Sequence, residues 1–194
     1  MEPEQVAMAH LEEETLDRIQ ERLWVLQAKA GDTEAFGKLL ARHEQRLIYF
    51  LRRLIPRPED VLDAHQELWL DIFRGLRNLR SPDAFRGWLY RLARAKAARF
   101  FHRDFQETAR LEPLDDEHAE LGDGAAPVAD VEAIHLALDR LPEAQREVLT
   151  LHYLRDLSLE EIAEAVECPV GTVKSRLHHA RLAMRQQIER NRHE

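Results

Sequence analysis

Residues 157–188 read LSLEEIAEAVECPVGTVKSRLHHARLAMRQQI, and this stretch decides the fold of the C-terminal part of the chain. Ser158, followed three residues later by Glu161, forms a capping box that predicts the start of a short helix. Cys168-Pro169 marks a second start, because proline is favoured at the first helical position. The sequence therefore predicts two helices joined by a tight turn.

Apolar and polar residues separate onto opposite faces of these two expected helices. The residues expected to be buried are Leu159, Ile162, Ala163 and Val166 in the first helix and Val170, Val173, Leu177, Ala180, Met184 and Ile188 in the second. The outer side of the second helix is rich in hydroxyl and basic side chains, at Thr172, Ser175, Arg176 and His179 on one face and at Lys174, His178, Arg181 and Arg185 on the adjoining one. This arrangement is typical of a helix-turn-helix that enters a DNA major groove. An ordinary helical hairpin with a basic surface is the alternative.

Outside this motif, charge is distributed unevenly along a chain whose net charge is −8. Residues 74–104 contain nine bases and two acids, and residues 174–192 contain six bases and one acid. Between these blocks, residues 106–132 contain nine acids and one base. Two basic blocks separated by an acidic connector indicate two contacts with a polyanion such as DNA. Solvated helix faces are the alternative interpretation of such charge runs.

The composition of the 194 residues excludes several classes of protein. The single cysteine, Cys168, excludes an internal disulfide framework and a cysteine-based zinc cluster. Ten histidines are scattered without metal-ligand spacing, and no glycine-rich phosphate loop is present, so we expect no metal, no cofactor and no catalytic residues. Because no apolar run is long enough to cross a bilayer and the N-terminus lacks a secretion signal, we expect a cytoplasmic protein without membrane insertion.

The remaining segments also have helical patterns, so the expected fold class is all-α. Helices are expected over 11–30, from the N-cap Asp32 to Pro56, from about Glu59, and over 83–105 after a break at Ser81-Pro82. Residues 106–129 are acidic and poor in aromatic residues, which predicts a flexible linker. The expected units are an N-terminal acidic extension over 1–22, a helical domain over 23–105, the linker over 106–129, and a helix-turn-helix domain over 130–194.

The helix expected from Glu59 carries a polar patch, Asp63, Gln66 and Glu67, at positions i, i+3 and i+4. This patch lies opposite an apolar stripe made of Val61, Leu68, Ile72 and Leu76. A solvated helix face is the alternative to a docking surface at these positions.

Three segments together resemble the extracytoplasmic-function sigma factors, the small two-domain sigma subunits of bacterial RNA polymerase. GTVKSRLHHAR (171–181), preceded by LPEAQREVLTLHYLRDLSLEEIA (141–163), resembles region 4 of that family. DAHQELWLDIF (63–73) is similar to the D-x-x-Q-E signature of region 2, and FRGWLYRLARAKAARFFHRDF (85–105) is similar to the segment of region 2 that melts and reads the −10 element. The resemblance extends over most of residues 24–104 and over the C-terminal domain.

The resemblance implies a promoter-specificity subunit, not an enzyme. Its partners would be core RNA polymerase, through the β′ clamp helices and the β flap, promoter DNA, and an anti-sigma factor. The implied polymerase-binding residues are Asp63, Gln66 and Glu67. The implied −10 contacts are Arg86, Arg91, Arg94, Lys96, Arg99 and Arg103, and the implied −35 contacts are Thr172, Lys174, Ser175, Arg176, His179 and Arg181.

Four positions depart from the family pattern. Glu167 stands in the turn where glycine is frequent, which predicts a strained backbone, and His179 replaces the more usual arginine. Ala95 and Ala98 stand where asparagine and aspartate are common, which leaves the −10 preference open. A stand-alone helix-turn-helix regulator is the alternative function.

Overall fold

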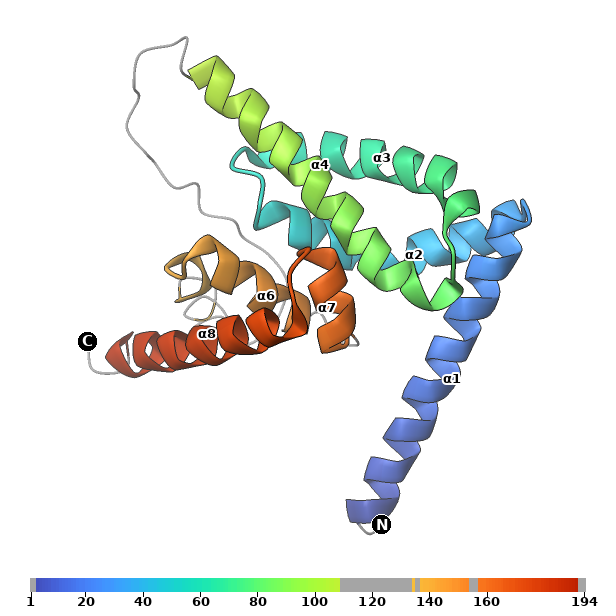
Figure 1. Ribbon diagram of the computed structural model, residues 1–194, viewed down its shortest axis with the longest axis horizontal. Helices are drawn as coiled ribbons and strands as arrows, with labels where there is room; N and C mark the ends of the chain where they lie inside the picture. Colours follow the sequence, from blue (N-terminus) through green and yellow to red (C-terminus); the bar gives the residue numbers. More distant parts are fainter. Residues whose placement is uncertain (1–2, 109–133, 135–136, 154–156, 192–194) are drawn as a thin grey trace.

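The computed structural model describes residues 3–108, 134, 137–153 and 157–191. Every element in this part of the chain is helical, which confirms the all-α prediction. The N-terminal domain contains the helices α1 (Pro3–Lys29), α2 (Thr33–Arg52), α3 (Pro58–Gly75) and α4 (Phe85–Thr108), with short 3-10 turns η1 (Leu76–Asn78) and η2 (Pro82–Ala84) between α3 and α4. The C-terminal domain contains α6 (Glu143–Tyr153), α7 (Leu159–Ala165) and α8 (Val170–Asn191) (Figure 1).

Local capping explains where several helices begin. The Asp32 carboxylate accepts hydrogen bonds from the backbone N–H groups of Glu34 and Ala35, at 2.9 and 3.1 Å, and so starts α2. Gly31 ends the preceding helix with a φ of 103°, which glycine adopts at low cost. Ser158 and Glu161 form the predicted capping box of α7.

Two boundaries differ from the sequence predictions. Helix α1 begins at Pro3 rather than near residue 11, and its residue Glu21 is buried in the N-terminal domain. The N-terminal domain therefore includes part of the expected 1–22 extension, because an acid inside that extension is a core contact. Helix α4 continues to Thr108, three residues into the expected linker. Residues 106–129 were predicted to form a flexible linker. Of these, residues 109–129 lie outside the described part of the chain.

The core of the N-terminal domain is formed by the faces that α1, α2, α3 and α4 turn toward one another. The predicted apolar stripe is buried: Val61, Leu68 and Ile72 of α3 and Leu76 of η1 are at most 2% exposed. Phe50 and Tyr90 pack edge to face, with ring centroids 5.4 Å apart, and join α2 to α4. This core fixes which sides of α3 and α4 face outward.

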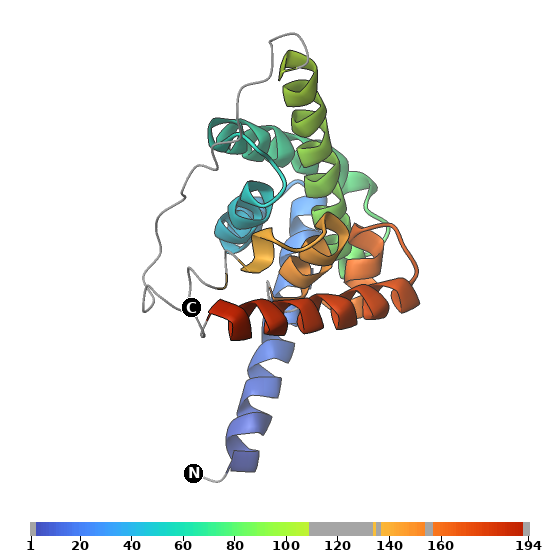
Figure 2. The same cartoon turned by 90° about the vertical axis from the view of Figure 1, so that its left-hand side faces the viewer.

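The two domains pack against each other rather than standing apart. Helix α7 of the C-terminal domain contacts α4 of the N-terminal domain, and the buried apolar residues of both domains belong to one continuous cluster. Figure 2 shows α6, α7 and α8 below α4, with α8 crossing in front of α1.

Candidate nucleic-acid interface

The helix-turn-helix buries part of its predicted core, while Leu159, Ala163, Val170 and Met184 are half-buried. Ile162 of α7 and Val173 of α8 are 0% exposed, and Leu177 and Ala180 continue the buried side of α8. In the turn, the Cys168 N–H donates to the carbonyl of Ala163 at 3.1 Å. This packing fixes the angle at which α8 leaves α7 and therefore which side of α8 reaches solvent.

The turn also has the strain predicted from its sequence. Glu167 has a φ of 52°, in the left-handed region that glycine adopts more readily than other residues. Glu167 lies between α7 and α8, and its side chain is exposed. Its carboxylate lies 3.9 Å from the guanidinium of Arg94 on α4.

The predicted DNA-facing residues of α8 lie on its outer side. Lys174, Ser175, His179 and Arg181 are exposed, whereas Thr172 and Arg176 are half-buried. Two of the basic side chains contact the domain itself. Arg176 Nη1 lies 3.9 Å from Cys168 Sγ, and Arg181 Nη2 lies 2.8 Å from His152 Nε2 of α6. Burial, and then the nearby charge of Arg181, lower the pKa of His152, which favours the neutral imidazole at this contact.

The polar patch of α3 is exposed, and it is bordered by apolar side chains that the sequence reasoning missed. Asp63, Gln66 and Glu67 are all exposed. Leu62, Leu70 and Phe73 lie on the same side of the helix, with exposed fractions of 57%, 54% and 54%. The sequence contains a signal for this apolar border. Leu70 and Phe73 follow Leu62 at i+8 and i+11, and residues at these intervals lie on one side of a helix.

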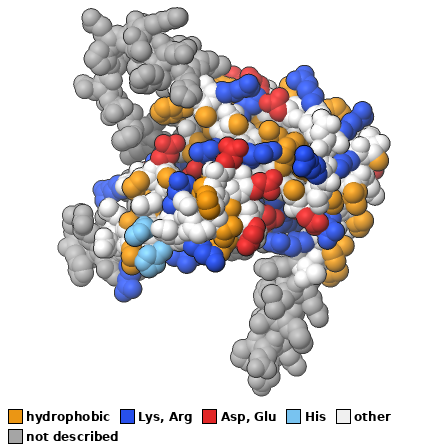
Figure 3. Space-filling view, in the orientation of Figure 1, with side chains coloured by type: hydrophobic (Ala, Val, Ile, Leu, Met, Phe, Trp, Pro, Cys, Tyr) orange, Lys and Arg blue, Asp and Glu red, His pale blue; other side chains and the backbone are white. Residues whose placement is uncertain are grey.

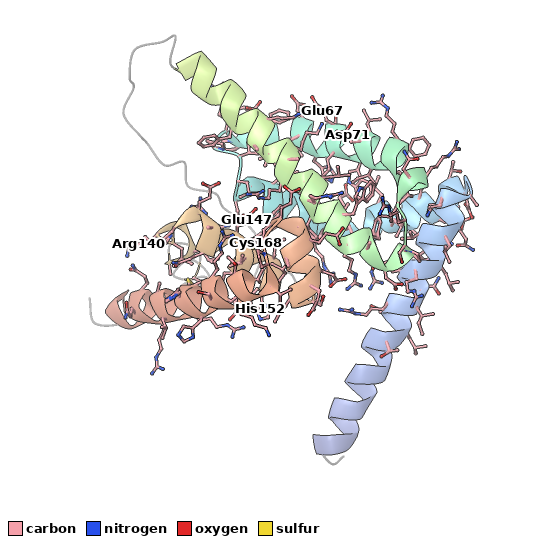
Figure 4. All side chains as sticks on the ribbon, in the orientation of Figure 1. Glu67, Asp71, Arg140, Glu147, His152 and Cys168 are labelled. Atoms are coloured by element: carbon pink, nitrogen blue, oxygen red, sulfur yellow. The ribbon has the colours of Figure 1, made fainter. Side chains whose placement is uncertain are left out.

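Lys96 of α4 is buried, and it pairs with two acids of α3, Glu67 and Asp71, which Figure 4 labels. Its Nζ lies 3.1 Å from Glu67 Oε2 and 2.7 Å from Asp71 Oδ2. The predicted polymerase-binding patch and the predicted −10 helix are therefore joined by a direct ion pair. Lys96 holds these two elements together and does not face solvent.

Arg86 is also inside the protein, where it contacts α1. It is 4% exposed, and its Nε lies 2.5 Å from Glu21 Oε2. Glu21 is hydrogen-bonded to His43 of α2 at 2.7 Å as well. Burial raises the pKa of Glu21, but the hydrogen bond to His43 and the charges of His43 and Arg86 together lower it to about 2. The expectation that Arg86 and Lys96 contact DNA is therefore corrected. Both side chains are buried, and both form ion pairs within the domain, with acids of α1 and α3.

The other predicted −10 residues of α4 differ in how far their side chains are exposed. Arg91 and Arg94 are half-buried and Arg99 is exposed; the side chain of Arg103 lies outside the described part. Arg94 Nε lies 2.7 Å from the buried carboxylate of Glu147 on α6. Burial raises the pKa of Glu147, and the neighbouring Arg94 opposes this effect.

The aromatic residues at the start of α4 pack in or against the core of the N-terminal domain. Phe85 is 1% exposed and contacts the His43 ring edge to face. Trp88 is half-buried and packs so closely on Gly75 of α3 that a Cβ there would lie 2.9 Å from its ring. Phe85 therefore positions α4 on α2, and Trp88 positions it on α3.

The described residues contain no group of His, Cys, Asp or Glu arranged to hold a metal ion. Among the same residues, no helix is long and apolar enough to cross a membrane.

Comparison with known proteins identifies both domains. Residues 39–104 match the family model "Sigma-70 region 2", and residues 131–184 match "Sigma-70, region 4". The RNA polymerase sigma-H factor of Pseudomonas aeruginosa is 31% identical over 185 residues, which covers 87% of this chain and 94% of that protein. The chain belongs to the extracytoplasmic-function sigma factors.

Further relatives of this sigma factor agree with that assignment. The ECF RNA polymerase sigma-E factor of Escherichia coli is 29% identical over 185 residues, covering 89% of this chain and 96% of the relative. The structure of CnrH in complex with the cytosolic domain of CnrY matches with a TM-score of 0.65 and 26% identity, covering 88% of this chain and 97% of CnrH. RpoE of Bartonella quintana, in complex with the anti-sigma factor NepR, shares the fold with a TM-score of 0.71 at 20% identity.

The function of the protein is accordingly that of an RNA polymerase sigma factor in transcription initiation. The two family models occur in the order that the sequence resemblance implied, and a stand-alone helix-turn-helix regulator is not favoured. Sigma factors as a family are not enzymes.

Proposed function

We propose that this sigma factor binds core RNA polymerase through the exposed face of α3. The observation that carries this proposal is the combination on one face of Asp63, Gln66 and Glu67 with exposed apolar side chains such as Leu70 and Phe73. Apolar side chains within a polar border are typical of protein–protein interfaces. The acids would pair with basic side chains of the β′ clamp helices, while the apolar side chains would supply the buried contact area.

Promoter DNA is then contacted by one helix from each domain. We assign the −35 contacts to the outer side of α8, through Thr172, Lys174, Ser175, Arg176, His179 and Arg181. For the −10 contacts on α4, we retain Arg91, Arg94, Arg99 and Arg103. Arg86 and Lys96 would instead act indirectly, since their buried ion pairs hold α4 against α1 and α3.

The proposed partners and location follow from this function. CnrH and RpoE were each solved with another protein, CnrY or the anti-sigma factor NepR. By analogy, we infer that an anti-sigma factor holds this protein, that the chain is not an enzyme, and that it acts in the cytoplasm with the polymerase. The domain division that we propose is a polymerase-binding and −10-binding unit followed, after the linker, by a −35-binding unit.

The polymerase contact is tested by the double variant Asp63→Lys, Leu70→Lys, measured as affinity for core polymerase. It leaves the Lys96 ion pairs in place, so the free energy of unfolding should change by less than about 1 kcal/mol. We expect affinity for core to fall at least about tenfold, because a charge is reversed and an apolar contact is lost. The control is Glu44→Lys, Leu23→Lys, which makes the same charge change at exposed positions of α2 and α1.

Unchanged core affinity in the first variant would overturn the α3 assignment. A separate measurement compares promoter binding with and without core polymerase. Tight, sequence-specific binding of promoter duplex by the protein alone would favour the stand-alone regulator.

A further inference from the structure

Helix α6 packs against α8, and two polar side chains lie at the edge of this contact. Leu151 of α6 and Ala180 of α8 are both 0% exposed and belong to the core. His152 and Arg181 are the residues that follow them directly in the chain. The core that joins α6 to α8 therefore fixes where the backbones of His152 and Arg181 lie relative to each other.

Arg181 donates a hydrogen bond to His152, which Figure 4 labels. The distance from Arg181 Nη2 to His152 Nε2 is 2.8 Å. A guanidinium group has N–H donors and no acceptor, so the imidazole must accept at Nε2. The ring is then neutral and carries its proton on Nδ1, which is buried. Burial and, after it, the charge of Arg181 lower the pKa of His152, in agreement with a neutral ring.

Arg181 belongs to the basic side of α8. Figure 3 shows His, Lys and Arg side chains along this helix. Lys174, His178 and Arg185 are seven, three and four residues away from Arg181, so the four residues lie on one side of α8. Arg181 is thus exposed among the proposed −35 contacts, while a side chain of another helix holds one of its nitrogens.

This hydrogen bond orders a side chain that would otherwise have to be ordered by DNA. Ordering a long, flexible side chain at an interface weakens binding about two- to tenfold. His152 removes that cost, because Arg181 is already held before DNA binds. Since His152 engages Nη2, the N–H groups on Nη1 and Nε remain able to donate to DNA.

We propose that His152 of α6 is a positioning residue for promoter recognition, which holds Arg181 of α8 in the orientation that contacts the −35 element. The inference rests on the proposed −35 role of α8 and adds a residue of a different helix to it. His152 supplies no charge to the DNA, because the ring accepts from Arg181 only in its neutral form.

The test removes the acceptor and then restores it. Holoenzyme is assembled from core polymerase with His152→Leu, which has no acceptor, or with His152→Gln, whose amide oxygen is a neutral acceptor near the place of Nε2. The probe is a fluorescent duplex selected with the wild-type holoenzyme from a library randomised over the −35 element. We expect His152→Leu to lower the affinity for this duplex about three- to tenfold. His152→Gln should keep the wild-type affinity.

Gln187→Leu is the matched control. Arg140 Nη1 donates to Gln187 Oε1 of α8 at 3.3 Å, so this change also removes a neutral acceptor from an arginine of the same domain. Neither residue belongs to the proposed −35 contacts, and we expect the affinity to remain that of the wild type. His152→Ala, a second variant without an acceptor, should reproduce the loss seen in His152→Leu. Urea denaturation of every variant separates a loss of binding from a loss of folding.

A double-mutant cycle shows whether His152 acts through Arg181. In the Arg181→Ala background, His152→Leu should change the affinity by less than about twofold, because the group that it positions is gone. The slope of log affinity against log salt should be the same for His152→Leu and the wild type, since a neutral ring neutralises no phosphate.

The outcomes separate this proposal from the −35 assignment. Equal losses in His152→Leu and His152→Gln, or an undiminished loss in the Arg181→Ala background, would overturn the positioning role. So would a slope reduced by about one in His152→Leu, which would make His152 a cationic phosphate contact. Unchanged affinity in His152→Leu, with weaker binding in Arg181→Ala, would overturn the positioning role and leave the −35 assignment intact. Unchanged affinity in Arg181→Ala would overturn the −35 assignment of Arg181 together with the role that rests on it.

Discussion

Helices α4 and α8 are both rich in Arg and Lys. Two of these cations are buried in ion pairs in α4, whereas the cations of α8 compared with them here are exposed. In α4, Arg86 and Lys96 are 4% and 5% exposed and pair with acids of α1 and α3. In α8, Lys174 and Arg181 are exposed. The difference arises because α4 is surrounded by other helices of its domain, whereas only the apolar side of α8 is covered. A basic run in a sequence therefore does not by itself indicate which cations can reach DNA.

The buried pairs of α4 also have a larger energetic effect than exposed ones. Transfer of a charge from water into the protein interior costs several kcal/mol, which a well-placed opposite charge offsets. Removal of one partner therefore leaves the other charge without compensation. The same change at the surface costs little, because water solvates the remaining charge.

The largest effect should follow from Glu21→Gln. This change removes the carboxylate that pairs with the buried Arg86, and we expect the free energy of unfolding to fall by about 3–5 kcal/mol. Glu34→Gln, at an acid whose side chain is 80% exposed, should change it by less than about 0.5 kcal/mol. Urea denaturation followed by circular dichroism measures both. Similar losses in the two variants would remove the distinction between buried and surface pairs.

Acid should weaken the same buried pair. The pKa of Glu21 falls from 4.5 to about 2 on folding, so its contribution to stability is fully present above pH 4.5 and is lost as the pH falls toward 2. This shift corresponds to about 3 kcal/mol. Unfolding curves at several pH values between 5 and 2 should show a smaller loss for Glu21→Gln than for the wild type. An identical pH dependence would show that Glu21 is not the group that titrates.

For α8, the expected effects concern recognition rather than stability. A bidentate contact of Arg176 to guanine would be worth about 1–3 kcal/mol of discrimination. Arg176→Ala should therefore relax the preference at one or two positions of the −35 element, measured as binding of the holoenzyme to single-base promoter variants. An equal loss on every variant would make Arg176 a backbone contact.

The smallest effect is expected for Lys174→Ala. If Lys174 neutralises one phosphate, the substitution should weaken binding to all promoters alike and reduce the slope of log affinity against log salt by about one. The free energy of unfolding should remain within about 0.5 kcal/mol of the wild type, because Lys174 is exposed. We would measure holoenzyme binding at two salt concentrations and the free energy of unfolding. The second value is compared with that of Glu21→Gln. A stability loss as large as that of Glu21→Gln would contradict this prediction.

The sequence alone determined the features that depend on local chemistry. The capping box at Ser158, the N-cap at Asp32 and the strained turn at Glu167 follow from interactions between residues at most a few positions apart. The apolar stripe of α3 follows from helical periodicity. The family assignment has the same basis, because its motifs are contiguous segments.

The tertiary structure decided which charged side chains are exposed and able to bind DNA. Arg86 is buried by an acid 65 residues earlier in the chain, and Arg94 meets one 53 residues later. No local pattern encodes such pairs, because they depend on how the helices pack. Helix α4 gained the carboxylates of Glu147 and Glu167 beside Arg94 in the same way. A side chain's type fixes its charge, but only its packed neighbours fix whether that charge is buried, paired or free to bind DNA.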